Sequence, residues 1–229
     1  MGLIPGIGIC AFAPKARNYA DIGLVYKRTS LGYTTTSNVT YTIDSYANGS
    51  LILFFVESVS TENPIGTSGY IKIASIAGNG TTLSIYYKIC DGTSNNIFFA
   101  TVVGHYTHYY CVHSNVDITN PINVYGTSKQ DTSTTSLNAP AVTTTRNKCL
   151  VINATGVRFR HFMGNGASAW ANLYLSSFAE FCDYAGEVGA VVIATGFMVT
   201  AGNTGLTTFT YDTSTPATSI TFALNPKEI

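Results

Sequence analysis

The chain has 229 residues, enough for one large β domain or two small ones with a sizeable core. Only 10% of the residues are charged, and 12 Lys and Arg balance 12 Asp and Glu, so the formal net charge is zero. This composition argues against nucleic acid as a partner, because nucleic acid is bound by clustered Lys and Arg, and it leaves little repulsion between copies, which favours a homo-oligomer.

The residue types favour strands and turns. The chain holds 15 Tyr, 12 Phe and 21 Gly, together with many Thr and Val. Its five cysteines are widely spaced and include no C-x-x-C pair, which argues against a zinc ribbon or a thioredoxin-type site. Three of them lie in apolar strand patterns, so we expect reduced thiols and assembly in a cytoplasm. The five are Cys10, Cys90, Cys111, Cys149 and Cys182.

Residues 1–25 predict an extended arm, because Gly and Pro interrupt short apolar groups that repeat at neither 2 nor 3.6 residues. Positive charge follows the apolar stretch instead of preceding it, which argues against a secretory signal, and no run reaches the ~20 apolar residues of a membrane helix. We therefore expect no membrane association. Apolar side chains of the arm would be costly to expose in water, so we expect them to attach the chain to a neighbouring subunit. They are Leu3, Ile4, Ile7, Ile9 and Phe12.

Strand patterns begin at residue 39. Residues 39–43 alternate and lead through a turn at 47–49 into 51–56, which is apolar on both faces and predicts a central strand. Further strands are expected at 70–74, 83–89, 97–103 and 109–114. The last of these is followed by a turn-rich stretch, 115–121, where Asn, Asp and Pro disfavour regular structure.

The second half of the chain has a similar pattern. Residues 137–152 match 39–56, and the later strand patterns match in the same order: 190–197 with 83–90, 207–213 with 97–103, and 219–224 with 109–114. We see no amphipathic helix. The pattern predicts an all-β, jelly-roll-like two-sheet antiparallel β-sandwich at 39–229, consistent with duplicated halves, behind an N-terminal arm or attachment segment at 1–38.

Seven segments carry a family resemblance. In chain order they are GSLILFF (49–55), GYIKIAS (69–75), SIYYKI (84–89), VDITNPI (116–122), NAPAVTTT (138–145), AGNTG (201–205) and FALNP (222–226). Together they resemble a module of tailed-bacteriophage virions that occurs in capsid decoration, head-fibre, tail-fibre and baseplate proteins. The resemblance covers about residues 39–226. It departs at Tyr70, where the family usually has Trp.

The resemblance implies a non-enzymatic structural protein of the virion, assembled in the host cytoplasm. We expect a capsid decoration or cement protein whose partners are the major capsid or tail proteins. The alternative is a tail- or head-fibre or receptor-binding protein with a carbohydrate-binding surface for a host glycan. The resemblance does not choose between head and tail.

Catalytic and metal-binding patterns have simpler explanations. His105, His108, Cys111 and His113 suggest zinc, but zinc needs four convergent ligands, and a Tyr- and His-rich strand accounts for them as well. The chain has no G-x-S-x-G motif, and its carboxylates fall mostly in turns, loops or strand ends. We therefore expect no catalytic residue, metal site or cofactor.

Three tyrosines offer a surface for sugar. Tyr106, Tyr109 and Tyr110 would form a stacking platform if exposed, as an adhesin uses. The alternative is core packing or a subunit contact, because aromatic side chains dominate both.

Overall fold

A computed structural model describes residues 18–34, 38–41, 43–58, 69–92, 97–100, 104–158, 170–185 and 189–229. The first half of the chain forms β1 (Gly23–Thr34), β2 (Asn38–Tyr41), β3 (Leu51–Ser58), β4 (Ile71–Gly78), β5 (Thr81–Ile89), β6 (Ile97–Ala100) and β7 (Gly104–Ser114). The second half forms β8 (Ile122–Ala139), β9 (Cys149–Val157), β10 (Trp170–Ala171), β11 (Ser176–Ala185), β12 (Ala190–Met198) and β13 (Thr207–Leu224). These ranges contain no helix, and hence none long and apolar enough to cross a bilayer.

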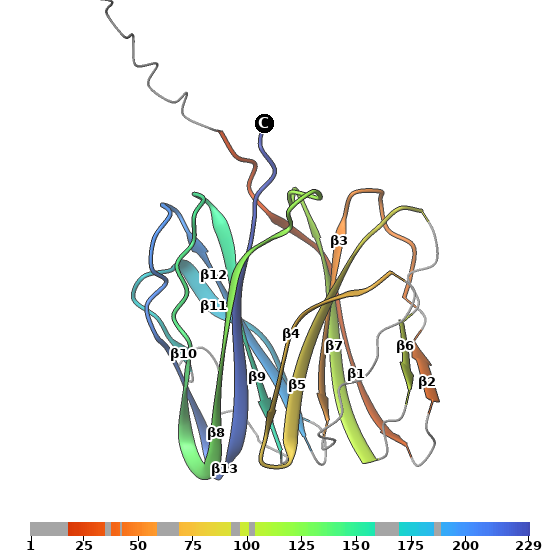
Figure 1. Ribbon diagram of the computed structural model, residues 1–229, viewed down its shortest axis with the longest axis vertical. Helices are drawn as coiled ribbons and strands as arrows, with labels where there is room; N and C mark the ends of the chain where they lie inside the picture. Colours follow the sequence, from red (N-terminus) through yellow and green to blue (C-terminus); the bar gives the residue numbers. More distant parts are fainter. Residues whose placement is uncertain are drawn as a thin grey trace, which may run out of the picture.

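Two antiparallel sheets pack face to face (Figure 1). The first has the order β1-β7-β3-β5-β4, and the second has the order β8-β13-β9-β12-β11, with β10 beside the N-terminal part of β13. β2 and β6 form a separate two-stranded pair. The predicted all-β, two-sheet sandwich is confirmed.

The two sheets have the same topology, which is the repeat that the sequence predicted. β1, β3, β4, β5 and β7 occupy the places that β8, β9, β11, β12 and β13 occupy in the second sheet. Each half of the chain forms one whole sheet, so strands of the two halves do not interleave. The long β8–β13 pair, from Ile122↔Leu224 to Ala139↔Thr207, corresponds to two shorter pairs in the first half, β1–β7 and β2–β6.

The strand orders of the two sheets run in opposite directions across the sandwich, so that β1 lies opposite β11 and β4 lies opposite β8. β3 lies against β9 at the centre. On one side Lys27 of β1 donates to the carbonyl oxygen of Phe181 in β11, and on the other the Asn79 amide, in the turn after β4, donates to Asp131 Oδ1 in β8 at 3.0 Å. A pseudo-twofold axis between β3 and β9 would place the strands in this way.

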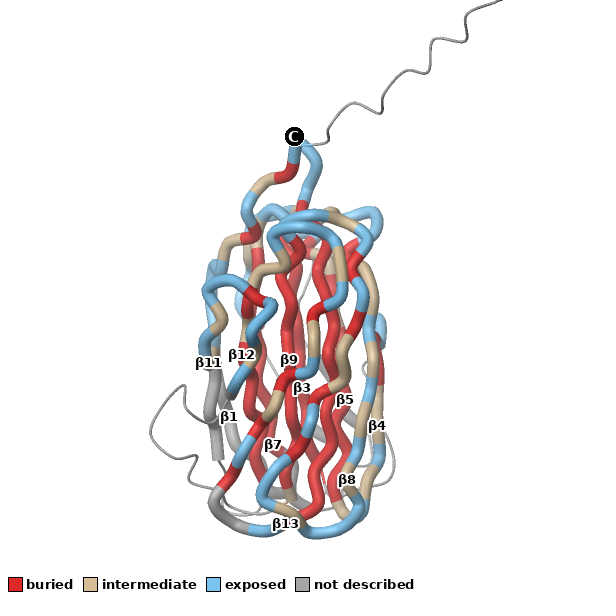
Figure 2. The backbone as a smooth tube through the Cα atoms, turned by 90° about the vertical axis from the view of Figure 1, so that its left-hand side faces the viewer, coloured by how far each residue is buried: buried red, intermediate tan, exposed pale blue. Residues whose placement is uncertain are grey.

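The core lies between the sheets, where β3 and β9 are buried along their whole length (Figure 2). Leu51, Leu53 and Phe55 face the second sheet, while alternate side chains such as Ile52 and Phe54 fill a second cluster on the outer face. The expected central strand, apolar on both faces, is therefore confirmed.

The outer face of the second sheet is covered by its own longest strands. Leu137 of β8 and Phe209 of β13 pack on the apolar outer side of β9 and β12, because both strands bend and return over the sheet. The bend falls where the β8–β13 register shifts, on either side of Thr215, next to Pro216. Proline donates no backbone hydrogen bond and is tolerated at such irregularities.

The expected boundary at residue 38 between arm and sandwich is wrong. β1 pairs with β7 along its whole length, and Tyr19 bridges to Glu228. A register shift between Leu24 and Tyr26 breaks the alternation that would have marked this strand in the sequence. The expected attachment residues Leu3, Ile4, Ile7, Ile9 and Phe12 lie outside the described residues.

Candidate functional site

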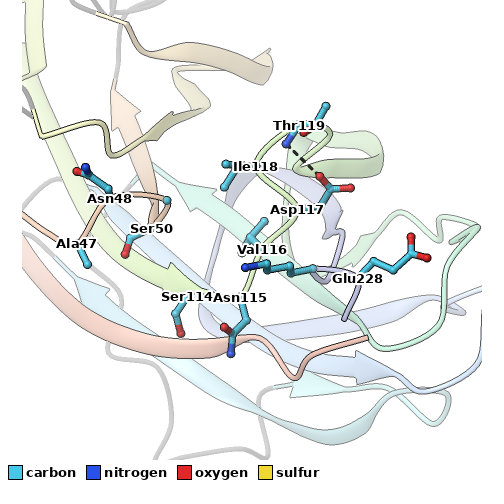
Figure 3. Close-up of a pocket in the computed structure, with 12 residues that line it drawn as sticks. Ala47, Asn48, Ser50, Ser114, Asn115, Val116, Asp117, Ile118, Thr119 and Glu228 are labelled. Atoms are coloured by element: carbon cyan, nitrogen blue, oxygen red, sulfur yellow. Dashed lines mark hydrogen bonds between the residues drawn. The ribbon is translucent and has the colours of Figure 1, made fainter. Parts of the chain in front are cut away.

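A pocket of about 810 Å³ opens at one end of the sandwich, where three pieces of chain meet (Figure 3). Residues 47–50 form its first wall, 114–119 its second, and Lys227 and Glu228 its third. The first wall is a tight turn in which the Gly49 amide donates to the Cys90 carbonyl oxygen, and Gly49 has a φ of 81°, which favours glycine.

The second wall is built around Asp117. Its Oδ1 accepts hydrogen bonds from the amides of Thr119 at 3.0 Å and Asn120 at 3.2 Å, while its Oδ2 accepts one from Arg146 Nη1 at 2.7 Å. Burial opposes ionisation of this carboxyl group, but the hydrogen bonds from Arg146 and the two amides outweigh it and lower the pKa of Asp117. The ionised Asp117 carboxylate therefore links the β7–β8 loop to the β8–β9 loop.

Asn225 joins the same loops from the C-terminal side. Its Nδ2 donates to the Asn120 carbonyl oxygen at 2.7 Å, and its Oδ1 accepts from Asn123 Nδ2 at 2.7 Å. Asn123 in turn accepts from the Thr145 amide at 3.0 Å. Asn225 is only 4% exposed, so these bonds satisfy a buried polar side chain.

The segments that carry the family resemblance meet here. VDITNPI holds Asp117 and Asn120, FALNP holds Asn225, and NAPAVTTT holds Thr145. NAPAVTTT also pairs with AGNTG, since the amide of Thr144 donates to Gly202 and that of Thr204 donates to Val142. The other three segments are in and beside neighbouring strands of the first sheet. The motif residues are thus structural ties between distant parts of the chain.

The third wall is the C-terminal tail, which runs between the β7–β8 loop and the residues before β1. Lys227 donates its amide to the Asn115 carbonyl oxygen, while the amides of Ala20 and Ile229 pair with Lys227 and Asn18. Asn115 has a φ of 60°, a conformation that Asn tolerates better than most residues. Both described ends of the chain therefore lie at this end of the molecule (Figure 1).

The possible zinc ligands do not converge. Cys111 Sγ and His113 Nε2 lie 3.4 Å apart inside the core, but His108 lies on the opposite face, stacked on Phe54. Burial lowers the pKa of His113 to about 4, against a hydrogen bond with Gly23, so its ring is neutral at pH 7. No group of three or more metal-binding side chains occurs in the described part of the chain, and the side chain of His105 lies outside it.

Of the two interpretations of the tyrosines, core packing is confirmed for Tyr109 and Tyr110, and the sugar platform is wrong for both. Tyr109 is 1% exposed and packs edge-on against Phe55 and Phe181, and Tyr110 is 4% exposed beneath Tyr26. Neither ring is free to stack on a sugar. The side chain of Tyr106 lies outside the described residues.

Sequence reasoning missed the partners of the Asp117 loop. Nothing in the sequence connected Asp117 to Arg146, which lies 29 residues later. The turn-rich stretch 115–121 is confirmed as a loop in which Asp117 accepts from the Thr119 and Asn120 amides, but no spacing rule identifies a partner in another loop.

No family model, curated protein or solved structure matches the chain.

Proposed function

We propose that this chain is a non-enzymatic structural protein of a tailed-bacteriophage particle, a capsid decoration or cement protein. The observation that supports the proposal is the meeting of four resemblance segments at one end of the sandwich. Asn225 of FALNP bonds to Asn120 of VDITNPI, and Asn123, directly after VDITNPI, bonds to Thr145 of NAPAVTTT. NAPAVTTT in turn pairs with AGNTG through backbone hydrogen bonds. These segments resemble a virion module, and hydrogen bonds hold them to one another, as expected for residues that define a fold.

The same end is suited to attachment. The described chain begins at Asn18, beside the C-terminal tail, and the apolar residues of segment 1–17 precede it directly. A subunit contact of ~1,600 Å² at ~25 cal/mol per Å² would give ample hydrophobic driving force before the entropic costs of association. The neutral surface adds no long-range repulsion against neighbouring subunits.

The experiment uses particles stripped of this protein and two forms of the chain, full-length and lacking residues 1–17. Truncation before Asn18 leaves the Tyr19–Glu228 bridge and β1 intact, so we expect an unchanged melting temperature. The full-length chain should co-sediment with the particles, and the truncated chain should not. Failure of the full-length chain to bind would refute the proposal, whereas binding of both forms would place the attachment site outside segment 1–17.

A fibre or receptor-binding protein is the second candidate, and the pocket favours it. Asn48 and Glu228 present exposed polar side chains at this pocket of about 810 Å³. A glycan array with the full-length chain and an Asn48→Ala variant tests this function. Binding that is lost in the variant would support it, and an array with no bound glycan would contradict it.

A further inference from the structure

Two large apolar side chains protrude from the loop before β11. Leu173 is 97% exposed and Tyr174 is 66% exposed, and Leu206 is exposed beside them. We call Leu173 and Tyr174 the knob. Single exposed apolar residues are common on soluble proteins, but adjacent ones on a fixed loop are typical of interaction sites.

The knob is held rigidly by the residue before it. Asn172 Oδ1 accepts from the amides of Tyr174 at 2.7 Å and Leu175 at 3.1 Å. Its Nδ2 donates to the Thr204 carbonyl oxygen at 3.0 Å and to Thr207 Oγ1 at 2.8 Å. Four hydrogen bonds thus fix a loop that exposes Leu173 and Tyr174 and buries Leu175.

Gly205 completes this support. Its φ is 67°, and a Cβ at this position would lie 2.1 Å from the ring of Tyr174, so only glycine lets the ring lie against the backbone. A side chain that is already fixed loses little entropy on binding, which is the property of an interface anchor.

An apolar groove lies next to the knob. It consists of two hollows of about 340 and 280 Å³ that share Lys148 and Val199. Phe197 lines the first hollow, and Tyr19 and Ile229 line the second. Lys148 forms the rim, where its Nζ pairs with Asp21 Oδ1 at 3.0 Å.

Knob and groove are neighbours along one hairpin. Ser176 pairs with Phe197 in the β11–β12 register, so the knob just before Ser176 lies beside the strand end that carries Val199. A twofold contact requires a patch that is complementary to itself, in which residue i of one copy meets residue j of the other and the reverse. The knob, with its exposed apolar side chains, lies beside the apolar groove and meets this requirement.

We propose that this face forms a twofold homodimer, in which the knob of each copy enters the groove of the other. The zero net charge of the chain leaves little repulsion to oppose the contact. The exposed apolar side chains of the face together offer about 500 Å² per copy and about 1,000 Å² in the dimer, the lower limit for a specific interface. They are Leu173, Tyr174, Val199, Leu206 and Ile229. The dimer is independent of the proposed virion function, since it forms without any particle.

Sedimentation of the purified full-length chain over a concentration series tests the dimer. Leu173→Asp should raise the dissociation constant at least ~30-fold, the loss expected for an interface anchor. Ile71→Asp is the matched control, because Ile71 is 55% exposed on β4, an edge strand of the other sheet, and should dimerise like the wild type. A monomeric wild-type chain, or equal effects of the two variants, would overturn the proposal.

A crosslinking experiment tests the geometry. Leu173→Cys chains are mixed with Val199→Cys chains that carry a mass tag, and the mixture is oxidised. A mixed disulfide dimer is expected, and an Ile71→Cys chain in place of the Leu173→Cys chain should give none.

The competing occupant of the groove is segment 1–17 of the same chain. A chain without that segment should still dimerise and crosslink, and loss of both on its removal would overturn the proposal.

Discussion

Replacing Asn225 by Ala tests the network that ties the loop end together. The substitution removes the bonds to the Asn120 carbonyl oxygen and to Asn123 Nδ2, both 2.7 Å long, and leaves these groups in a partly buried place. Each lost bond costs about 1 kcal/mol, and an unsatisfied partner adds about 1–3 kcal/mol. We expect a loss of about 2–4 kcal/mol, a large part of a typical stability of ~5–15 kcal/mol.

Equilibrium urea unfolding measures this loss directly, and for a chain of this size it corresponds to a fall in melting temperature of about 5–15 °C. Asn138→Ala is the matched control, since Asn138 is exposed and its side chain accepts one bond, from Thr208 Oγ1 at 3.1 Å. We expect the control to lose no more than ~0.5 kcal/mol. Equal effects of the two substitutions would show that the hydrogen bonds of Asn225 do not hold the loop end together.

Further predictions concern the core and its titrating groups. Leu53→Asp and Ile85→Asp, each placing a charge in the core, should prevent soluble folding, whereas Ser133→Asp should not, and a cooperatively melting Leu53→Asp chain would contradict the fold. The pKa of His113 is about 4 in the folded chain and near 6.5 in the unfolded chain, so the free energy of unfolding should fall by about 3 kcal/mol between pH 6.5 and 4. In urea titrations, His113→Gln should lack this part of the stability loss in acid. Because its hydrogen bonds with Arg146 and two amides lower the folded pKa of Asp117, its contribution is complete at neutral pH and is lost as pH falls through the folded pKa. Asp117→Asn should therefore cost about 1 kcal/mol at pH 7 and progressively less as the carboxyl group is protonated in acid. Alkylation of the unfolded chain without reductant should modify all five cysteines by mass spectrometry, and a preserved disulfide would refute cytoplasmic assembly.

The main strands could be predicted because their periodicity directly reflects burial. Leu51–Val56 is apolar at every position and is buried on both faces, and 109–114 alternates and places Cys111 and His113 on the inner face. The repeat could also be predicted, since each half carries the same succession of strands and forms one sheet. The strands and their order can be recognised in the sequence because the side chains of a strand alternate between two faces, and therefore between two environments, every two residues.

What could not be predicted depends on contacts between distant segments. The sequence places Tyr109 and Tyr110 correctly on a strand, but it does not show that Phe181 and Tyr26 cover their rings. The predicted arm was too long, because it included β1. The irregular register of β1 hides the alternation of its side chains, and its partner strand β7 lies about 80 residues away in the sequence. The knob is likewise invisible in sequence, since Leu173 and Tyr174 resemble core residues until Asn172 is seen to turn them outward.

Immunogold labelling of purified particles tests the proposed function most directly. Particles are collected from the host that produces the chain, washed at high salt, and labelled with an antibody against the described sandwich. We predict gold distributed over the capsid surface, with the chain present in the particle fraction by mass spectrometry. Gold confined to the tail would favour the fibre alternative. A chain abundant in the lysate but absent from washed particles would contradict a structural role in the virion.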